Sequence, residues 1–213
     1  MLKATKEKLD ALYTGGKHRG TDGQLHEIDT QVRVGQEQGE IIATLHGRLR
    51  PELSVEVGLA YGFSTLYILD SMQRGKYGRH IAIDPGADDY WHGIGLRAVE
   101  ETGLSDRFQW IKASSHEAIP QLLAHGERVQ FVYIDGAHLF DYALVDFFLS
   151  DKILDIGGLI VFDDMWLPAI KRVVSFVAMN ASWYEHVDGQ CDNLAVFKKT
   201  ANDTRAWDHF ADF

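Results

Sequence analysis

The sequence predicts an α/β fold built on a mostly parallel β-sheet, and two observations carry this prediction. From Pro51 onward, short apolar runs rich in β-branched residues alternate with segments that have helical spacing. Such alternation is typical of a parallel sheet that helices cover on both faces. The last two runs are separated only by a tight turn at Gly189-Gln190, so we expect an antiparallel pair at the end of the chain.

The predicted elements follow this alternation in chain order. Residues 3–13 and 36–48 have the spacing of helices, and the Gly-, Thr- and Asp-rich stretch 14–30 between them is predicted to be a loop. The predicted strands are SVEVG (54–58), HIAID (80–84), FQWIKA (108–113), VQFVYID (129–135), LIVFDD (159–164), SWYEHVDG (182–189) and CDNLAVFKK (191–199). The helices expected among them are 64–73, 95–103, 116–126, 138–154 and 168–180.

Two segments carry more apolar side chains than their position requires. The helix at 139–153 is more apolar than a one-faced surface helix, so we expect it to be buried between the sheet and its neighbours, with a subunit interface as the alternative. The tail 200–213 mixes aromatic and acidic residues, and we expect it to be docked. The predicted organisation is an N-terminal helix with a lid-like loop (1–35), one large domain (36–199) and this tail.

Composition excludes several classes of function. The formal net charge is −10, and an acidic surface repels phosphate backbones, so nucleic acid is not expected as a partner. No apolar run reaches the roughly 18–20 residues that span a bilayer, and the N-terminus lacks the apolar core of a secretory signal. Cys191 is the only cysteine, so no internal disulfide can form. We therefore expect a cytoplasmic protein without membrane contact, and the sequence leaves assembly into a homo-oligomer open.

The first motif, EVGLAYGFST (56–65), lies where the first parallel strand ends and a helix begins. Gly58 and Gly62 expose the backbone where a ligand or a close turn requires it. Ser64 and Thr65 can cap the helix, whose N-terminus favours an anionic group. The glycine spacing is neither the dinucleotide fingerprint nor the G-K-[ST] phosphate loop, and a tight turn alone would also explain it.

Two further motifs follow the next strands. Asp84 ends the second parallel strand, where an acidic residue is placed to accept hydrogen bonds from ribose hydroxyls; a turn cap is the alternative. The segment 111–117 follows the third strand, and Ser114, Ser115 or His116 can meet the edge of a base. The same residues fit the N-terminus of the next helix.

Three aspartates lie at the carboxyl ends of neighbouring strands: Asp135 at the fourth, and the adjacent pair Asp163 and Asp164 at the fifth. Such strand ends form the ligand crevice of a parallel sheet and lie about 5 Å apart, so we expect the three carboxylates to converge. This charge requires a counterion, and hard oxygen ligands favour Mg²⁺, with Mn²⁺ or Ca²⁺ as alternatives. The alternative without a metal is that one of the three aspartates caps a helix and the others make local hydrogen bonds.

His138 follows Asp135 by three residues, at the start of the next predicted helix. A helix N-terminus disfavours an imidazolium, so we expect a neutral and basic ring. A neutral imidazole beside a metal-bound hydroxyl can act as a general base. A capping or structural histidine is the alternative.

In this order, EVGLAYGFST, IAIDPG, YIDGAH and GGLIVFDDMW resemble the class I S-adenosylmethionine-dependent methyltransferases. Within them the similarity is to the small-molecule O-methyltransferase branch, which includes the catechol type and the macrolide-sugar and aminocoumarin-sugar types. The resemblance covers about residues 30–199. It implies a Rossmann-like, doubly wound sheet of seven strands with a reversed last strand, and makes 36–199 a single S-adenosylmethionine-binding domain.

The resemblance also implies roles for individual residues. Gly58 and Gly62 would contact the methionine part of the cofactor, and Asp84 would hold the ribose. The cofactor-binding set that it implies is Glu56, Gly58, Tyr61, Gly62, Ser64, Asp84, Ser114, Ser115, His116 and Asp135. A divalent cation, first of all Mg²⁺, would bind Asp135, Asp163 and Asp164; the sugar-modifying members share this pair, whereas the catechol type has Asp then Asn.

The chain departs from the catechol type at its catalytic base, where His138 replaces a lysine, so His138 and Asp135 are both candidates for that role. Three hypotheses therefore stay open. The first is a metal-assisted O-methyltransferase acting on a small hydroxylated molecule. The second is a metal-independent methyltransferase with His138 as base. The third is a non-catalytic scaffold that binds a nucleoside.

Overall fold

The computed structural model describes residues 1–187 and 191–213. The chain divides into two compact units, Met1–Ser114 and Ser115–Phe213. The predicted turn at Gly189-Gln190 lies outside the described residues. None of the helices in the described ranges has the length and apolar character needed to cross a bilayer.

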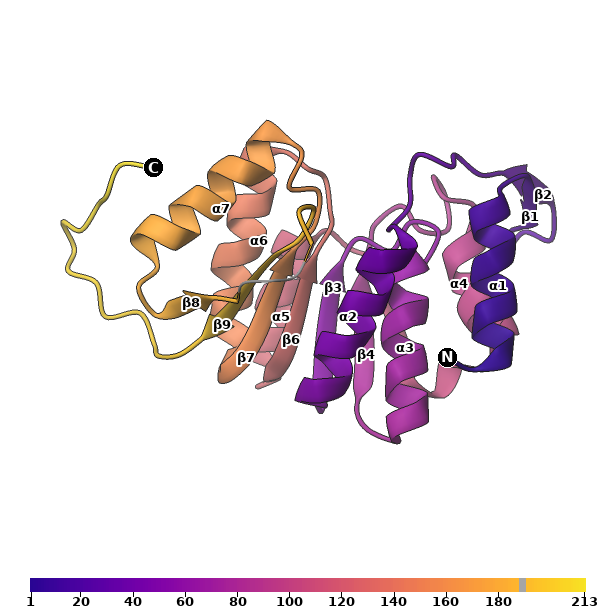
Figure 1. Cartoon of the computed structure of the whole chain (residues 1–213), viewed down its shortest axis with the longest axis horizontal. Coiled ribbons are helices and arrows are strands. Elements are labelled where there is room, and N and C mark those ends of the chain that lie inside the picture. The colour runs from indigo at the N-terminus through magenta and orange to yellow at the C-terminus, as the bar shows by residue number, and fades with distance from the viewer. Residues whose placement is uncertain (188–190) are drawn as a thin grey trace. The chain divides into compact units, whose positions relative to one another are not determined.

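The first unit combines helices, a small hairpin and three parallel strands (Figure 1). The strands have the order β5-β4-β3, and the helices α1 and α2 pack against α3. The elements are α1 (Lys3–Thr14), β1 (Lys17–Arg19), β2 (Leu25–Glu27), α2 (Gln36–Leu49), β3 (Leu53–Val57), α3 (Phe63–Gly75), β4 (Arg79–Ile83), α4 (Ile94–Glu101), η1 (Ser105–Arg107) and β5 (Phe108–Ile111).

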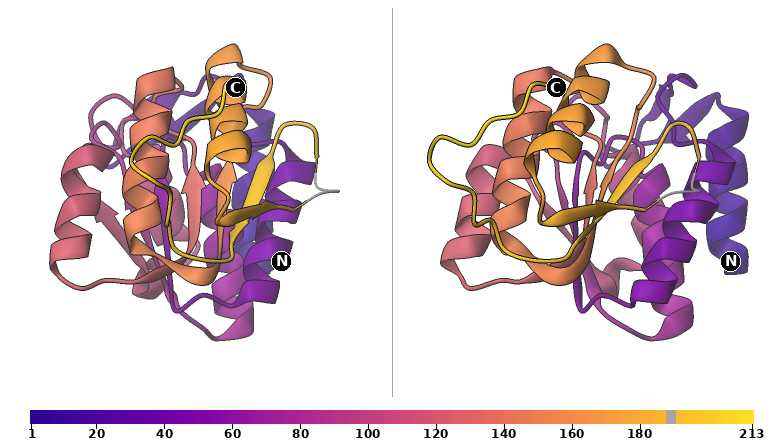
Figure 2. Two further views of the ribbon diagram at one scale, coloured as in Figure 1. Left: turned by 90° about the vertical axis from the view of Figure 1, so that its left-hand side faces the viewer. Right: turned by 60° about the vertical axis from the view of Figure 1, so that its left-hand side comes forward.

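In the second unit, the described residues form four strands and three helices (Figure 1). The strands β6 and β7 are parallel, whereas β9 pairs antiparallel with both β7 and β8. The helices α6 and α7 lie side by side (Figure 2). The elements are α5 (Ser115–Ala124), β6 (Val129–Ile134), α6 (Phe140–Ile153), β7 (Leu154–Phe162), α7 (Pro168–Asn180), β8 (Tyr184–His186) and β9 (Ala195–Lys199).

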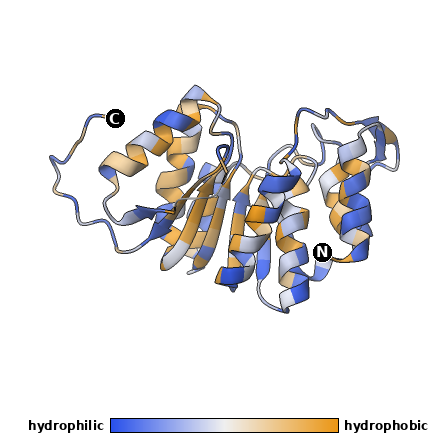
Figure 3. Ribbon diagram, viewed as in Figure 1, coloured by the Kyte–Doolittle hydropathy of each residue, from blue (hydrophilic) through white to orange (hydrophobic). Residues whose placement is uncertain are grey.

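The described strands other than β1 and β2 belong to one seven-stranded sheet with the order β5-β4-β3-β6-β7-β9-β8. The sheet is parallel except at β9, so the predicted fold class is confirmed. The central strands form because their apolar, β-branched runs are buried on both faces: β3 is buried at every residue, and the apolar colouring of β6 and β7 is plain in Figure 3. The carboxyl ends of these strands carry the residues that the sequence singles out.

The structure corrects three expectations about local structure. The stretch 14–30 contains the hairpin of β1 and β2, and β7 begins at Leu154 rather than at residue 159. The helix α6 is buried on one face only, so the prediction of a helix enclosed between the sheet and its neighbours is wrong. Apolar side chains of α6 and of its N-cap residue are exposed: Leu139, Phe140, Tyr142, Val145 and Phe148.

The C-terminal tail is docked, as predicted. Asn180 at the end of α7 exchanges two hydrogen bonds with the backbone of Ala211, over 2.8 and 2.9 Å. Arg172 donates to the carbonyl oxygen of Phe213, whose ring packs edge-on against Phe176. The tail therefore returns to α7 (Figure 2).

Candidate functional site

The glycine motif forms a tight connection between β3 and α3. Gly58 and Gly62 both have positive φ, at 95° and 81°. A Cβ on Gly62 would lie 3.1 Å from the Cα of Gly95 and 3.3 Å from its carbonyl oxygen. Gly62 is thus required by backbone conformation and by a close approach of α4.

Glu56 is fully buried at the end of β3 and is surrounded by donors. Ser64 donates to Oε2 over 2.9 Å, and Thr65 donates to Oε1. Nε2 of His80 lies 3.3 Å from Oε1, and Nδ1 of His80 lies 2.8 Å from the hydroxyl of Ser54. The expectation that the two hydroxyls cap α3 is wrong, because both are used to satisfy this carboxylate. These contacts hold the carboxylate of Glu56 in β3 against the first turn of α3, on either side of the glycine turn in sequence.

Asp84 holds the same turn from the end of β4. Its Oδ2 accepts hydrogen bonds from the backbone N–H groups of Leu59 and Ala60, over 2.9 and 3.0 Å, and its Oδ1 accepts from Gly86 over 2.7 Å. The carboxylate is nearly inaccessible. Asp84 therefore organises the glycine turn in this structure, and its contact with ribose stays a prediction.

Tyr61 connects the glycine turn to the N-terminal segment. The side chain is buried, and its hydroxyl accepts a hydrogen bond from the backbone N–H of Asp29 over 3.2 Å. The ring packs edge-on against Trp91, with 5.1 Å between centroids. Tyr61 therefore links the glycine turn to Asp29, which lies in the segment predicted to be lid-like.

The predicted base-edge residues lie at the end of the first unit and the start of the second. Ser114 ends the first unit, whereas Ser115 and His116 open α5. Burial raises the pKa of the nearby Asp146 carboxyl to about 6, while a hydrogen bond with Ser115 acts in the opposite direction. A cavity of about 260 Å³ in the second unit is lined by Ser115, His116, Asp141, Tyr142, Val145 and Asp146.

The candidate metal centre lies in the second unit, where the structure brings together Asp135, His138 and Asp164. One ligand atom from each lies within 4.8 Å of the others. Nε2 of His138 lies 2.6 Å from Oδ2 of Asp164 and 3.2 Å from Oδ1 of Asp135. The three side chains come from the loops after β6 and β7. The strand-end argument predicts Asp135, Asp163 and Asp164 as the metal ligands, and that assignment stays a prediction.

Asp163 lies beside this cluster but is held by protein donors. It is 4 % exposed. Its Oδ1 accepts from Nδ2 of Asn193 over 3.0 Å and from the backbone N–H of Asp164 over 2.6 Å. Its Oδ2 accepts from the hydroxyl of Tyr133. Asp163 is thus more enclosed than its neighbour, and the sequence gives no sign of this difference.

The charges in the cluster perturb one another. The carboxylates of Asp135 and Asp164 raise the pKa of His138 to about 10. Burial raises the pKa of Asp135. Burial also opposes ionisation of Asp164, but hydrogen bonds from His138 and Trp166 outweigh it and lower the pKa of that carboxyl. The predicted helix N-terminus does not adjoin the ring, because α6 begins only at Phe140. Two carboxylates face the ring instead, and a neutral, basic imidazole with a cation bound stays a prediction.

Two residues of the cluster have strained backbones. His138 and Asp164 both have φ of 58°, in the left-handed region that residues with a Cβ disfavour. Strain of this kind, of order 1–3 kcal/mol per residue, clusters at functional sites. Two carboxylates and an imidazole held in this way fit a divalent cation, whose charge would balance theirs.

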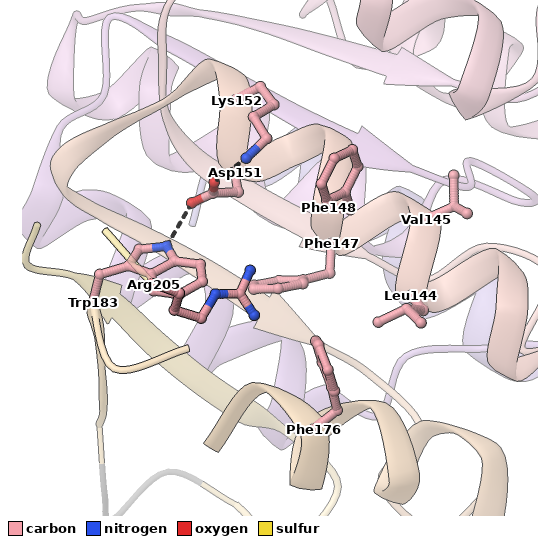
Figure 4. Close-up of a pocket in the computed structure, with 9 residues that line it drawn as sticks. All are labelled: Leu144, Val145, Phe147, Phe148, Asp151, Lys152, Phe176, Trp183 and Arg205. Carbon is pink, nitrogen blue, oxygen red and sulfur yellow. Dashed lines mark hydrogen bonds and ion pairs between the residues drawn. The ribbon is translucent and has the colours of Figure 1, made fainter. Parts of the chain in front are cut away.

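A second cavity, of about 260 Å³, lies between α6, α7 and the tail (Figure 4). Its walls are mostly apolar, and its charged side chains are engaged. Arg205 pairs with Asp203 and stacks on Trp183, and Lys152 pairs with Asp151. We assign it no chemistry. It is lined by Leu144, Val145, Phe147, Phe148, Asp151, Lys152, Phe176, Trp183 and Arg205.

Comparison with known proteins places this geometry in context. Residues 55–165, just over half of the chain, match a family model described as "Methyltransferase domain". Catechol O-methyltransferase B of Danio rerio is 26% identical over 187 residues, which cover 86% of this chain and 69% of that protein.

Solved structures show the same fold at low identity. A methyltransferase of Podospora anserina with bound S-adenosylhomocysteine superposes with a TM-score of 0.72 at 13% identity, over 94% of this chain and 89% of that one. An O-methyltransferase of Bacillus cereus in complex with S-adenosylhomocysteine gives a TM-score of 0.68 at 16% identity, over 93% and 92%.

Proposed function

Because the chain belongs to the family described as Methyltransferase domain, we propose that it transfers the methyl group of S-adenosylmethionine to a hydroxyl oxygen of a small molecule, with help from a divalent cation. The observation that carries the cation is the convergence of Asp135, His138 and Asp164. The catechol O-methyltransferase among its relatives supports oxygen as the acceptor atom.

The first unit supplies the residues for the cofactor. Glu56 and Asp84 hold the turn from Gly58 to Gly62, whose backbone would receive the methionine part. Asp84 is the candidate partner of the ribose, and Tyr61 and Ser64 support the turn. In the second unit, Ser115 and His116 line a cavity and are candidates to meet the adenine edge. Ser114 is the third candidate.

The second unit supplies the residues for the cation. Asp135 and Asp164 would bind it directly, and the enclosed Asp163 would complete its surroundings directly or through water. A bound cation lowers the pKa of a coordinated hydroxyl and fixes its orientation. Vicinal hydroxyls, as in a catechol or a sugar diol, would chelate it in two positions.

The transfer itself is an in-line displacement. The acceptor oxygen forms a bond to the methyl carbon, the carbon–sulfur bond breaks, and its electron pair stays on sulfur as S-adenosylhomocysteine. The proton of the hydroxyl passes to His138 or to Asp135, the two candidate bases. Positioning of the reactants contributes up to about 7–11 kcal/mol in ideal cases.

A metal-independent methyltransferase is the second candidate. The observation that favours it is the position of His138, whose Nε2 already contacts both carboxylates where a cation would lie. His138 would then act as base with Asp135 and Asp164 as its orienting partners.

A cytoplasmic location, the lack of a nucleic-acid partner and assembly into a homo-oligomer stay predictions.

Two measurements test the proposal. Calorimetry with S-adenosylmethionine tests the cofactor, and lack of binding would overturn the whole proposal. Transfer of a labelled methyl group to catechol, a vicinal sugar diol and a monohydroxylic phenol, with Mg²⁺ or with EDTA, tests the cation. We expect transfer to a vicinal diol with Mg²⁺ and loss of transfer in EDTA. Transfer that persists in EDTA and in the double variant Asp163→Ala, Asp164→Ala would favour the metal-independent reaction.

A further inference from the structure

The residues just before β9 lie at the same edge of the sheet as the acidic pair. The strand β9 is antiparallel to β7, and its first residue, Ala195, is paired with Phe162. Chain that enters an antiparallel strand lies beside chain that leaves its partner. Asn193 therefore reaches Asp163 and Asp164 from a neighbouring strand.

Asn193 makes four contacts with the acidic segment through three of its groups. Its Nδ2 lies 3.0 Å from Oδ1 of Asp163 and 3.5 Å from Oδ1 of Asp164. Its Oδ1 accepts from the backbone N–H of Trp166 over 3.4 Å, and its carbonyl oxygen accepts from the backbone N–H of Met165 over 3.2 Å. One side chain thus contacts both carboxylates and the backbone that follows them.

The chemistry of an amide suits this position. Two adjacent carboxylates repel each other, and Asp164 also has a strained backbone. A lysine here would neutralise the pair and compete with a cation. An amide N–H instead orients both oxygens without adding charge, so the negative charge stays available.

We infer that Asn193 is a positioning residue, which holds Asp163 and Asp164 in the orientation that binds a divalent cation. The inference rests on the cation of the proposed function. It assigns to the segment before β9 a part in the metal centre that the strand-end motifs do not include.

The test measures binding of Mn²⁺ alone to the full chain, from the electron paramagnetic resonance signal of free Mn²⁺. We expect Asn193→Ala to raise the dissociation constant about 10–100-fold, which is typical when a partner of a metal ligand is removed. Asn193→Leu, which keeps the branch at Cγ but has no donor, should do the same. The exposed Asn202→Ala is the matched control and should bind Mn²⁺ as the wild type does.

Thermal unfolding in EDTA separates positioning from folding. We expect the variants of Asn193 to unfold close to the wild type without metal while their Mn²⁺ affinity falls. Wild-type affinity in both variants would overturn the role of Asn193 and leave the cation proposal intact. A wild-type chain that binds no Mn²⁺ would overturn the cation proposal itself. If one variant does not fold, the other decides.

Discussion

Two pairs of adjacent aspartates lie in different regions of this chain and have opposite surroundings. Asp88 and Asp89, between β4 and α4, share one cation: Nζ of Lys112 lies 2.7 Å from Oδ1 of the first and 2.8 Å from Oδ2 of the second. After β7, Asp163 accepts hydrogen bonds from Asn193 and Tyr133, and Asp164 pairs with His138.

The comparison shows that two neighbouring acids do not make a site by themselves. In the pair at Asp88, the first carboxylate is half-buried, the second is exposed, and one lysine contacts both. The pair at Asp163 lies at a strand end, where Asp135 adds a third carboxylate. Position on the sheet and the convergence of further side chains distinguish a candidate cation site from a surface ion pair.

The largest expected effect comes from Asp164, the second residue of the pair after β7. Asp164→Ala should lower the rate of methyl transfer by about 10²–10⁴-fold and abolish Mn²⁺ binding, because it removes a direct ligand and the partner of His138. Asp89→Ala is the matched control and should leave both unchanged. Rates under saturating S-adenosylmethionine check this, and equal losses in the two variants would end the distinction between the pairs.

A buried carboxylate that the protein satisfies should act on stability instead. Glu56→Ala leaves the buried hydroxyls of Ser64 and Thr65 without their acceptor and removes the carboxylate that lies 3.3 Å from Nε2 of His80, so the free energy of unfolding should fall by about 3 kcal/mol. Glu56→Gln keeps the shape and one acceptor oxygen and should lose less. Urea unfolding measures both. A loss of the same size in Asp164→Ala would contradict the contrast between satisfied and convergent carboxylates.

Asp146 is an intermediate case, because it is 2 % exposed and one of its oxygens, Oδ1, has no hydrogen-bond partner among the described residues. Burial raises its pKa from 3.8 to about 6. The folded state therefore holds the proton more tightly, so the contribution of Asp146 to stability is complete below pH 3.8 and is lost as the pH rises through about 6.

Asp146→Asn removes this titration. The difference in unfolding free energy between variant and wild type should grow by about 2–3 kcal/mol in favour of the variant between pH 4 and pH 7. Urea unfolding at a series of pH values checks it. A difference that does not change with pH would show that the carboxyl is not destabilised by burial.

Much of the fold follows from the sequence, because apolar β-branched runs can hardly be placed except in the centre of a sheet. The resemblance to class I S-adenosylmethionine-dependent O-methyltransferases is confirmed at the level of family and fold. The strands of the hairpin β1–β2 were missed, since Lys17–Arg19 and Leu25–Glu27 are short, polar and mostly exposed. The exposed face of α6 was missed because a composition count does not say which residues share a face.

The site was predictable where a residue ends a strand, as Asp135 and Asp164 do. His80 and Asn193 were missed because their roles depend on pairing between strands. His80 meets Ser54 through the register of β3 and β4, and Asn193 meets Asp163 through that of β7 and β9. An acid or amide directly before an antiparallel last strand is the signal that would have found Asn193.

The smallest expected effect is at the surface pair. Lys112 and Asp89 are 46% and 76% exposed in their side chains, so water and salt already screen their attraction. Lys112→Ala should therefore change the unfolding midpoint by about 1 °C or less, and added salt should reduce the change further. Differential scanning calorimetry at low and high salt measures both. A decrease in stability as large as that expected for Glu56→Ala would mean that the ion pair of Lys112 and Asp89 also stabilises the chain between β4 and α4. The two aspartate pairs would then differ in their charged partners and not in their burial.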